Sequence, residues 1–167
     1  ARIEFGVIVD DCVFRVLGDP LKSIEYSEIS SGHIDEVTFY NPCCPKSIIG
    51  AALNYGDKPD LDPKMTEPII FFKNPNSICS STQNIKSPFI GENHWCEPEL
   101  ALVVSKQIKR PSWAEIPSSI LGFCPANDVT VENLYGHDRH LVRGKAADTF
   151  CPIGPYIDTN FDFRNKN

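Results

Sequence analysis

The chain has 167 residues, of which 41% are hydrophobic and 23% are charged, so it can bury one core and is not a disordered tail. A formal net charge of −6 argues against a general binder of nucleic acid or anionic membranes. No apolar run is long enough for a membrane span, the start lacks a signal pattern, and seven cysteines without C-x-x-C spacing favour reduced thiols. We therefore expect a cytoplasmic protein with no nucleic-acid or membrane partner.

The beginning of the chain predicts a small lobe that opens with a hairpin. Apolar residues at 3–9 and 13–17 flank Asp10 and Asp11, which are typical turn residues. From Gly18 to about residue 31 the apolar spacing is too irregular to assign an element. We place this N-terminal lobe at residues 1–45 and the main domain at residues 46–167.

Two short apolar runs, residues 47–53 and 68–73, open the main domain and predict strands. The first run lacks apolar and polar alternation, which predicts burial on both faces. Between them the chain is rich in Pro, Asp and Lys, which predicts a loop or lid.

The second half of the main domain continues the strand-rich pattern. Residues 99–104 (ELALVV) form the clearest strand, and residues 112–120 predict a short helix broken by Pro117. The last strand is predicted at residues 156–159, after a stretch of glycines and prolines. Together these elements indicate a β-rich fold with irregular connections and few short helices.

Candidate chemistry concentrates around Glu97 and Glu99. Side chains two positions apart on a strand project from the same face, so these two carboxylates would be adjacent and would repel each other. A hard divalent cation such as Mg²⁺ or Mn²⁺ relieves that repulsion and keeps positions open for a substrate. The alternative for an isolated E-x-E pattern is an exposed acidic strand face.

Five blocks in a fixed order resemble the fumarylacetoacetate hydrolase family. The blocks are ALNY at 52–55, EPIIFFK at 67–73, EPELALVV at 97–104, GFCPANDVT at 122–130 and KAADTFCPIGP at 145–155. The resemblance implies a mixed, β-rich α+β fold, which is a β-roll of twisted sheets with a small N-terminal lobe. It also implies that residues 46–167 form the catalytic domain.

By this resemblance, Glu97, Glu99 and Asp128 occupy the positions of the family's three acidic ligands for Mg²⁺ or Mn²⁺, with Ca²⁺ as a substitute in crystals. Lys145 matches the lysine beside the metal, where it would hold the substrate carboxylate or a developing oxyanion. Lys73 has two open interpretations, a positive charge at the mouth of the site or an ordinary lysine at the end of a surface strand.

The loop after residues 52–55 departs from the family pattern. Active members carry a histidine there, and a glutamate one turn later, whereas this chain has Lys58 at the histidine position. A protonated lysine is a poor general base in a solvated loop, so water-activated hydrolysis is disfavoured. We assign Lys58 a catalytic role in an enolate reaction, with nearby loop carboxylates as the alternative.

A second departure follows Asp128, where members that act on acylpyruvates or oxaloacetate carry an arginine and then a glutamine. Glu132 and Tyr135 stand near those positions and are our candidate substrate-binding residues beside Lys145. Replacing arginine by glutamate removes a bidentate carboxylate clamp, so a different substrate, or none, is implied.

These observations predict a divalent-metal-dependent enzyme that acts on a 2-oxo acid or 1,3-diketo acid through a metal-stabilised enolate. Hydrolysis of a C–C bond, decarboxylation and enol–keto isomerisation share that step. The alternative is a catalytically silent subunit that keeps the fold for binding or assembly. Family members continue with further strands, so we expect either that the sequence is part of a longer protein or that another chain completes the roll. The resemblance implies a homodimer.

Overall fold

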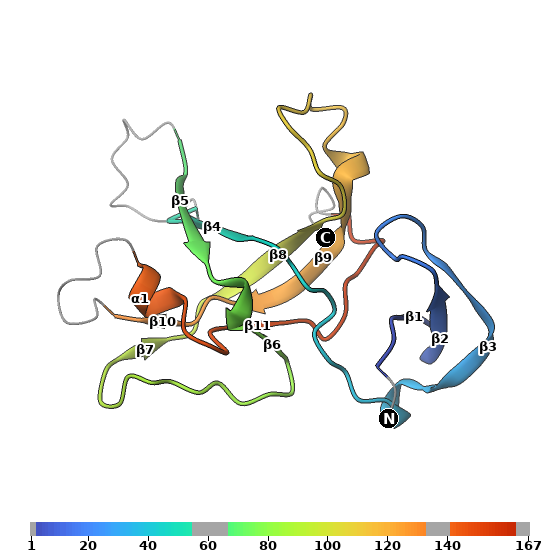
Figure 1. Ribbon diagram of the computed structural model, residues 1–167, viewed down its shortest axis with the longest axis horizontal. Helices are drawn as coiled ribbons and strands as arrows, with labels where there is room; N and C mark the ends of the chain where they lie inside the picture. The colour runs from blue at the N-terminus through green and yellow to red at the C-terminus, as the bar shows by residue number, and fades with distance from the viewer. Residues whose placement is uncertain (1–2, 55–66, 133–140, 163–167) are drawn as a thin grey trace.

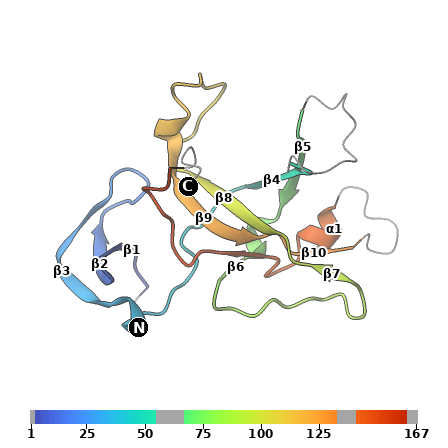
Figure 2. The ribbon, with the colours of Figure 1, turned by 180° about the vertical axis from the view of Figure 1, so that it is seen from behind.

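The computed structural model describes residues 3–54, 67–132 and 141–162 of the chain. Four sheets make up this part, and one short helix, α1 (Val142–Lys145), accompanies them. The three-stranded sheet at the N-terminus lies to one side of the other sheets, as the views from the front and from behind show (Figure 1, Figure 2). The expected β-rich fold is therefore confirmed, whereas the division at residue 45 remains a prediction.

The N-terminal sheet has the order β1-β2-β3. Its strands are β1 (Gly6–Val9), β2 (Cys12–Leu17) and β3 (Glu25–His33). Asp10 and Asp11 have φ angles of 47° and 61°, as the tight turn between β1 and β2 requires. The predicted hairpin is thus confirmed, and β3 forms in the segment whose pattern is irregular. A 3-10 helix, η1 (Ile34–Glu36), follows.

The central sheet has the order β6-β11-β9-β8. Its members are β6 (Ile78–Ser80), β8 (Pro98–Val104), β9 (Ile120–Asn127) and β11 (Cys151–Ile153). Strand β8 alternates between exposed and half-buried residues, and its inner face, with Ala101 and Val103, packs on a core of Cys124, Cys151 and Ile153. Short 3-10 turns, η2 (Pro75–Ser77) and η3 (Pro117–Ser119), precede β6 and β9.

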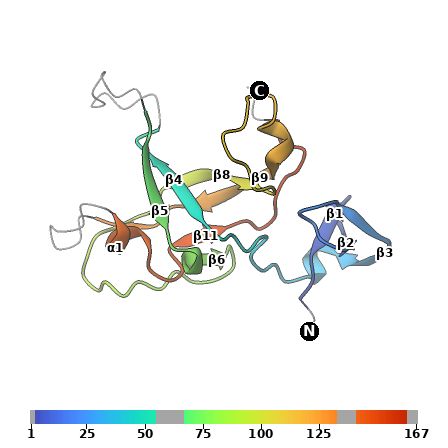
Figure 3. The same cartoon turned by 45° about the horizontal axis from the view of Figure 1, so that its top comes forward.

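Two small antiparallel pairs complete the arrangement. Strand β4 (Ile48–Ala52) pairs with β5 (Ile69–Lys73), and β7 (His94–Trp95) pairs with β10 (Thr130–Val131). The tilted view shows the β4–β5 pair standing apart from the N-terminal sheet (Figure 3). A second core cluster, formed by Val129, Val131 and Phe150, lies around β10.

Three local expectations are wrong. Strand β4 is not buried on both faces, because Ile49 is 61% exposed. The expected helix at 112–120 is only the turn η3. The last strand is β11, and residues 156–159 contribute a single bridge from Asp158 to Phe123.

No helix in the described ranges is long and apolar enough to cross a membrane. All seven cysteines fall within those ranges, and each is a free thiol. The core cysteines pack as small apolar side chains, which agrees with the expectation of reduced thiols.

Candidate active site

Two strand interruptions face each other and hold the acidic residues of the site. Glu97 lies between β7 and β8, and Asp128 lies between β9 and β10. The backbone N–H of Asp128 donates to the carbonyl of Glu97 at 2.9 Å, and the N–H of Glu97 donates to Asn127 Oδ1 at 3.1 Å. Because the flanking strands are paired on both sides of the break, the two carboxylates are fixed opposite one another.

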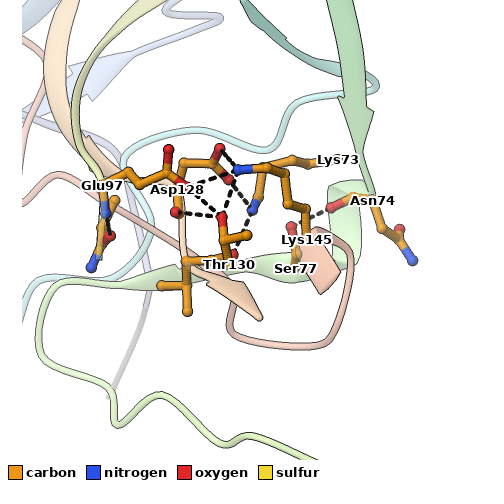
Figure 4. Close-up of polar contacts among 9 residues, drawn as sticks. Lys73, Asn74, Ser77, Glu97, Asp128, Thr130 and Lys145 are labelled. Atoms are coloured by element: carbon orange, nitrogen blue, oxygen red, sulfur yellow. Dashed lines mark hydrogen bonds and ion pairs between the residues drawn. The ribbon is translucent and has the colours of Figure 1, made fainter. Parts of the chain in front are cut away.

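Lys145, the last residue of α1, joins these carboxylates. Its Nζ lies 2.9 Å from Glu97 Oε1 and 2.5 Å from Asp128 Oδ2 (Figure 4). The whole residue is only 4% exposed, so its charge is removed from bulk water and requires these partners. The structure thus places Lys145 beside Glu97 and Asp128, whereas its assignment as a site residue stays a prediction.

Lys73, at the end of β5, binds the other side of Asp128. Its Nζ lies 2.5 Å from Asp128 Oδ1 and 3.2 Å from the carbonyl of Val129 (Figure 4). Lys73 is 5% exposed. Burial lowers the pKa of Lys73, and the hydrogen bond and charge of Asp128 oppose that shift. Of the two interpretations left open by the sequence, the surface lysine is therefore wrong.

Thr130 is a site residue that the sequence did not single out. Its hydroxyl donates to Glu97 Oε1 at 2.6 Å and lies 2.5 Å from Lys145 Nζ. The hydroxyl therefore accepts a hydrogen bond from Lys145 and donates one to Glu97. The available signal was its position, two residues after Asp128, which places both side chains near one face of the chain.

The four charged groups compensate one another. Two lysine ammonium groups are matched by the carboxylates of Glu97 and Asp128, and each Asp128 oxygen accepts from a different lysine. Lys73, Asp128 and Lys145 are buried, and buried charges are stable only when they are paired and hydrogen-bonded. The cluster thus holds charged groups in fixed positions before any substrate arrives.

The predicted metal ligands are only partly gathered. Glu97 and Asp128 both lie within hydrogen-bond distance of one ammonium, whereas Glu99 sits in β8 opposite Ala126. Within the described ranges, no three His, Cys, Asp or Glu side chains are close enough to hold a metal ion. Glu97 and Asp128 carry carboxylate oxygens of the kind that Mg²⁺ or Mn²⁺ prefers, but both Asp128 oxygens accept from lysines in this arrangement. Metal binding by Glu97, Glu99 and Asp128 therefore stays a proposal.

The remaining predicted residues are less informative. Lys58 and Tyr135 lie outside the described residues. Glu132 is exposed just after β10, where its Oε2 accepts from Asn93 Nδ2 at 3.3 Å and its N–H donates to the Asn93 carbonyl at 3.0 Å. Its assignment to substrate binding stays a prediction.

The described chain thus combines a β-rich α+β fold with a site in which two carboxylates form ion pairs with two buried lysines. The family described as "Fumarylacetoacetate (FAA) hydrolase C-terminal" matches residues 47–167, which is more than half of the chain. The chain therefore belongs to the fumarylacetoacetate hydrolase family.

Three similar proteins illustrate this membership. An uncharacterized protein of Methanocaldococcus jannaschii is 35% identical over 156 residues, which cover 92% of this chain and 63% of that protein. The mitochondrial oxaloacetate tautomerase FAHD2A of Homo sapiens is 33% identical over 129 residues, which cover 74% of this chain and 41% of that protein. A crystal structure of 5-carboxymethyl-2-hydroxymuconate delta-isomerase from Mycobacterium smegmatis has a TM-score of 0.79 and 26% identity, and covers 93% of this chain and 61% of that one.

The chain is short relative to these proteins. It spans 63% of the archaeal relative and 41% of the human tautomerase. The family match and the fold are therefore established, whereas the activity of the whole protein is a matter for proposal.

Proposed function

We propose that this chain is the catalytic part of an enzyme that interconverts the enol and keto forms of a 2-oxo acid or 1,3-diketo acid. The observation that carries the proposal is Lys145, a buried ammonium fixed by Glu97, Asp128 and Thr130 at the centre of the charged cluster. The names of the relatives point to the same chemistry, since one is an oxaloacetate tautomerase and another a delta-isomerase.

Enol–keto isomerisation requires stabilisation of an enolate and a group that moves a proton. A Mg²⁺ or Mn²⁺ ion held by Glu97, Glu99 and Asp128 would supply a Lewis acid for the paired oxygens of the substrate. Lys145 would exchange one of its protein acceptors for the substrate carboxylate or the developing oxyanion, and its buried ammonium would stay in place as it does so. Lys58 is our candidate for the proton-transfer group.

Lys73 would compensate the charge of Asp128 during this reaction. When Lys145 turns a donor toward the substrate, Asp128 loses part of its compensation at Oδ2. Lys73 still donates to Oδ1, so the carboxylate stays neutralised within its buried surroundings. The second lysine thus allows the first to exchange partners.

Hydrolysis and decarboxylation remain the competing reactions on the same enolate. Lys58 stands where active members have a histidine, and this disfavours water-activated hydrolysis because a protonated lysine is a poor general base. Decarboxylation would consume the same substrates but release carbon dioxide, so product analysis separates it from isomerisation.

A catalytically silent subunit is the second candidate function, and one exposed surface supports the association that it requires. The outward face of the β4–β5 pair is apolar and exposed, with Ile49, Ile70 and Phe72 at 61%, 52% and 64%. Contiguous apolar surface of this kind is typical of contacts with other protein. It supports the proposal of a homodimer or of completion by another chain, which sedimentation of the parent and of Phe72→Ser would test through a loss of association.

The enzyme proposal is tested with the enol form of oxaloacetate in the presence of Mg²⁺ or Mn²⁺, following decay of the enol absorbance. We expect catalysis by the parent and a loss of about 10²–10³-fold in Lys145→Met, since one oxyanion donor is removed. The matched control is Lys106→Met, because Lys106 is an exposed lysine outside the cluster.

Pyruvate is measured in the same samples, and acetopyruvate is tried as a substrate for hydrolysis. Enol decay without pyruvate supports isomerisation, whereas pyruvate formation moves the assignment to decarboxylation or hydrolysis. If a folded parent with bound Mg²⁺ does not act on either compound, the silent subunit is favoured instead.

A further inference from the structure

The ring of Phe71 lies beneath the ammonium of Lys145. Its centroid is 4.9 Å from Lys145 Nζ, which is within the range of a cation–π interaction. The ammonium has three N–H donors, and Glu97, Asp128 and Thr130 each accept one. The ring therefore interacts with the charge of the lysine as a fourth partner that uses no hydrogen bond.

Gly50 allows the ring to take this position. It stands directly opposite Phe71 in the register of β4 and β5. A Cβ at Gly50 would lie 2.5 Å from Cε1 and 2.7 Å from Cε2 of the ring, distances at which one of the groups must shift. The backbone of Gly50 is not in the left-handed region, so glycine is needed here for space rather than for its φ angle.

The two faces of β5 have different surroundings. Phe71 and Lys73 are two positions apart and therefore project from the same face, toward Lys145 and Asp128 respectively. Phe72 projects from the other face and is 64% exposed. A single strand face thus contacts both members of the Lys145–Asp128 ion pair.

We propose that Phe71, seated on Gly50, is a positioning residue that fixes the ammonium of Lys145. In the proposed function, on which this role partly rests, a fixed ammonium stays beside the reacting oxygens while one of its N–H groups exchanges a protein acceptor for the substrate. The interaction also shields Lys145 from water on the side that its oxygen partners do not cover. A variant without the ring leaves Lys145 charged but less confined.

The test that does not depend on activity is acetylation of lysines by limiting acetic anhydride, followed site by site with mass spectrometry. Phe71→Met conserves most of the volume but removes the ring, and Phe72→Met is the matched control on the opposite face. We expect the acetylation rate at Lys145 to rise about 3- to 10-fold in Phe71→Met. Lys73, which is equally buried, serves as the internal reference and should keep its rate.

Gly50→Ala offers a second route to the same displacement and keeps the ring in the protein. It should raise acetylation at Lys145 as Phe71→Met does, while Phe72→Met should keep the rate of the parent. An unchanged rate at Lys145 in both Phe71→Met and Gly50→Ala would overturn the proposal. An equal rise at Lys73 and Lys145 would also overturn it, because it would indicate general loosening of the site.

The activity of the same variants separates this inference from the proposed function. With oxaloacetate, kcat/KM of Phe71→Met should fall about 3- to 10-fold, and Phe72→Met should keep the value of the parent. If the parent is inactive, the proposed function fails but the acetylation ratio still decides the role of Phe71. An active parent whose kcat/KM is unchanged in Phe71→Met would contradict the positioning role.

Discussion

Lys73 Nζ and Asp128 Oδ1 lie 2.5 Å apart although 55 positions separate the two residues in the chain. This contact fastens the end of β5 to the interruption between β9 and β10. It also makes Asp128 a carboxylate with a lysine on each oxygen. The consequences for stability and for ligand binding can be measured.

Lys73→Met should destabilise the chain. The variant leaves Asp128 with one cation instead of two in a buried place, and breaking a buried ion pair costs about 3 kcal/mol. For a chain of this size that corresponds to a fall in Tm of about 6–12 °C. Calorimetry checks the prediction against Lys106→Met, and equal Tm values for the two variants would mean that the pair contributes nothing net.

Thr130→Val should also be less stable than the parent. The hydroxyl accepts from Lys145 and donates to Glu97, so its removal leaves one buried donor without a partner. We expect a loss of about 1–3 kcal/mol in the free energy of unfolding, measured in urea. Thr130→Ser keeps the hydroxyl and should stay close to the parent, whereas similar losses in both variants would assign the effect to packing.

Mg²⁺ or Mn²⁺ should raise the thermal stability of the parent, because a ligand that binds only the native state stabilises it. At about 100 times the Kd the gain is about 2.7 kcal/mol, or about 5–10 °C in Tm. Glu97→Gln/Glu99→Gln should lose this shift, while Glu25→Gln/Glu28→Gln on the remote strand β3 should keep it. A parent that shows no shift would contradict the assigned ligands.

Cys151 should make stability depend on alkaline pH. Burial raises the pKa of the Cys151 thiol from 9.0 to about 11 in the folded chain. Because the unfolded chain loses this proton first, the thiol's contribution is complete below pH 9 and is lost as the pH rises toward 11. At about pH 10.5 the loss is about 2 kcal/mol.

Urea unfolding of the parent and of Cys151→Ala, each from neutral to alkaline pH, isolates this effect. Tyrosines and lysines titrate in both proteins, so only the difference between the two curves reports Cys151. We expect the parent to lose its advantage above pH 9. Parallel curves over the whole range would contradict the raised pKa of Cys151.

Local sequence was sufficient for several elements and for part of the site. Alternating or continuous apolar residues located β5 and β8, and the polar pair Asp10 and Asp11 located the first turn. The block patterns around Glu97, Asp128 and Lys145 indicated the family and brought the three residues into one site. These features depend on neighbours within a few positions, which a sequence displays directly.

Only the tertiary structure decided which partners these residues have. The sequence left Lys73 open between two surroundings and gave no reason to select Thr130, yet both lie in the cluster around Asp128 and Lys145. Likewise, the apolar run of β4 does not reveal that Ile49 faces outward while Gly50 receives the ring of Phe71. Burial and pairing arise from strands that are distant in the chain, so periodicity along one strand cannot specify them.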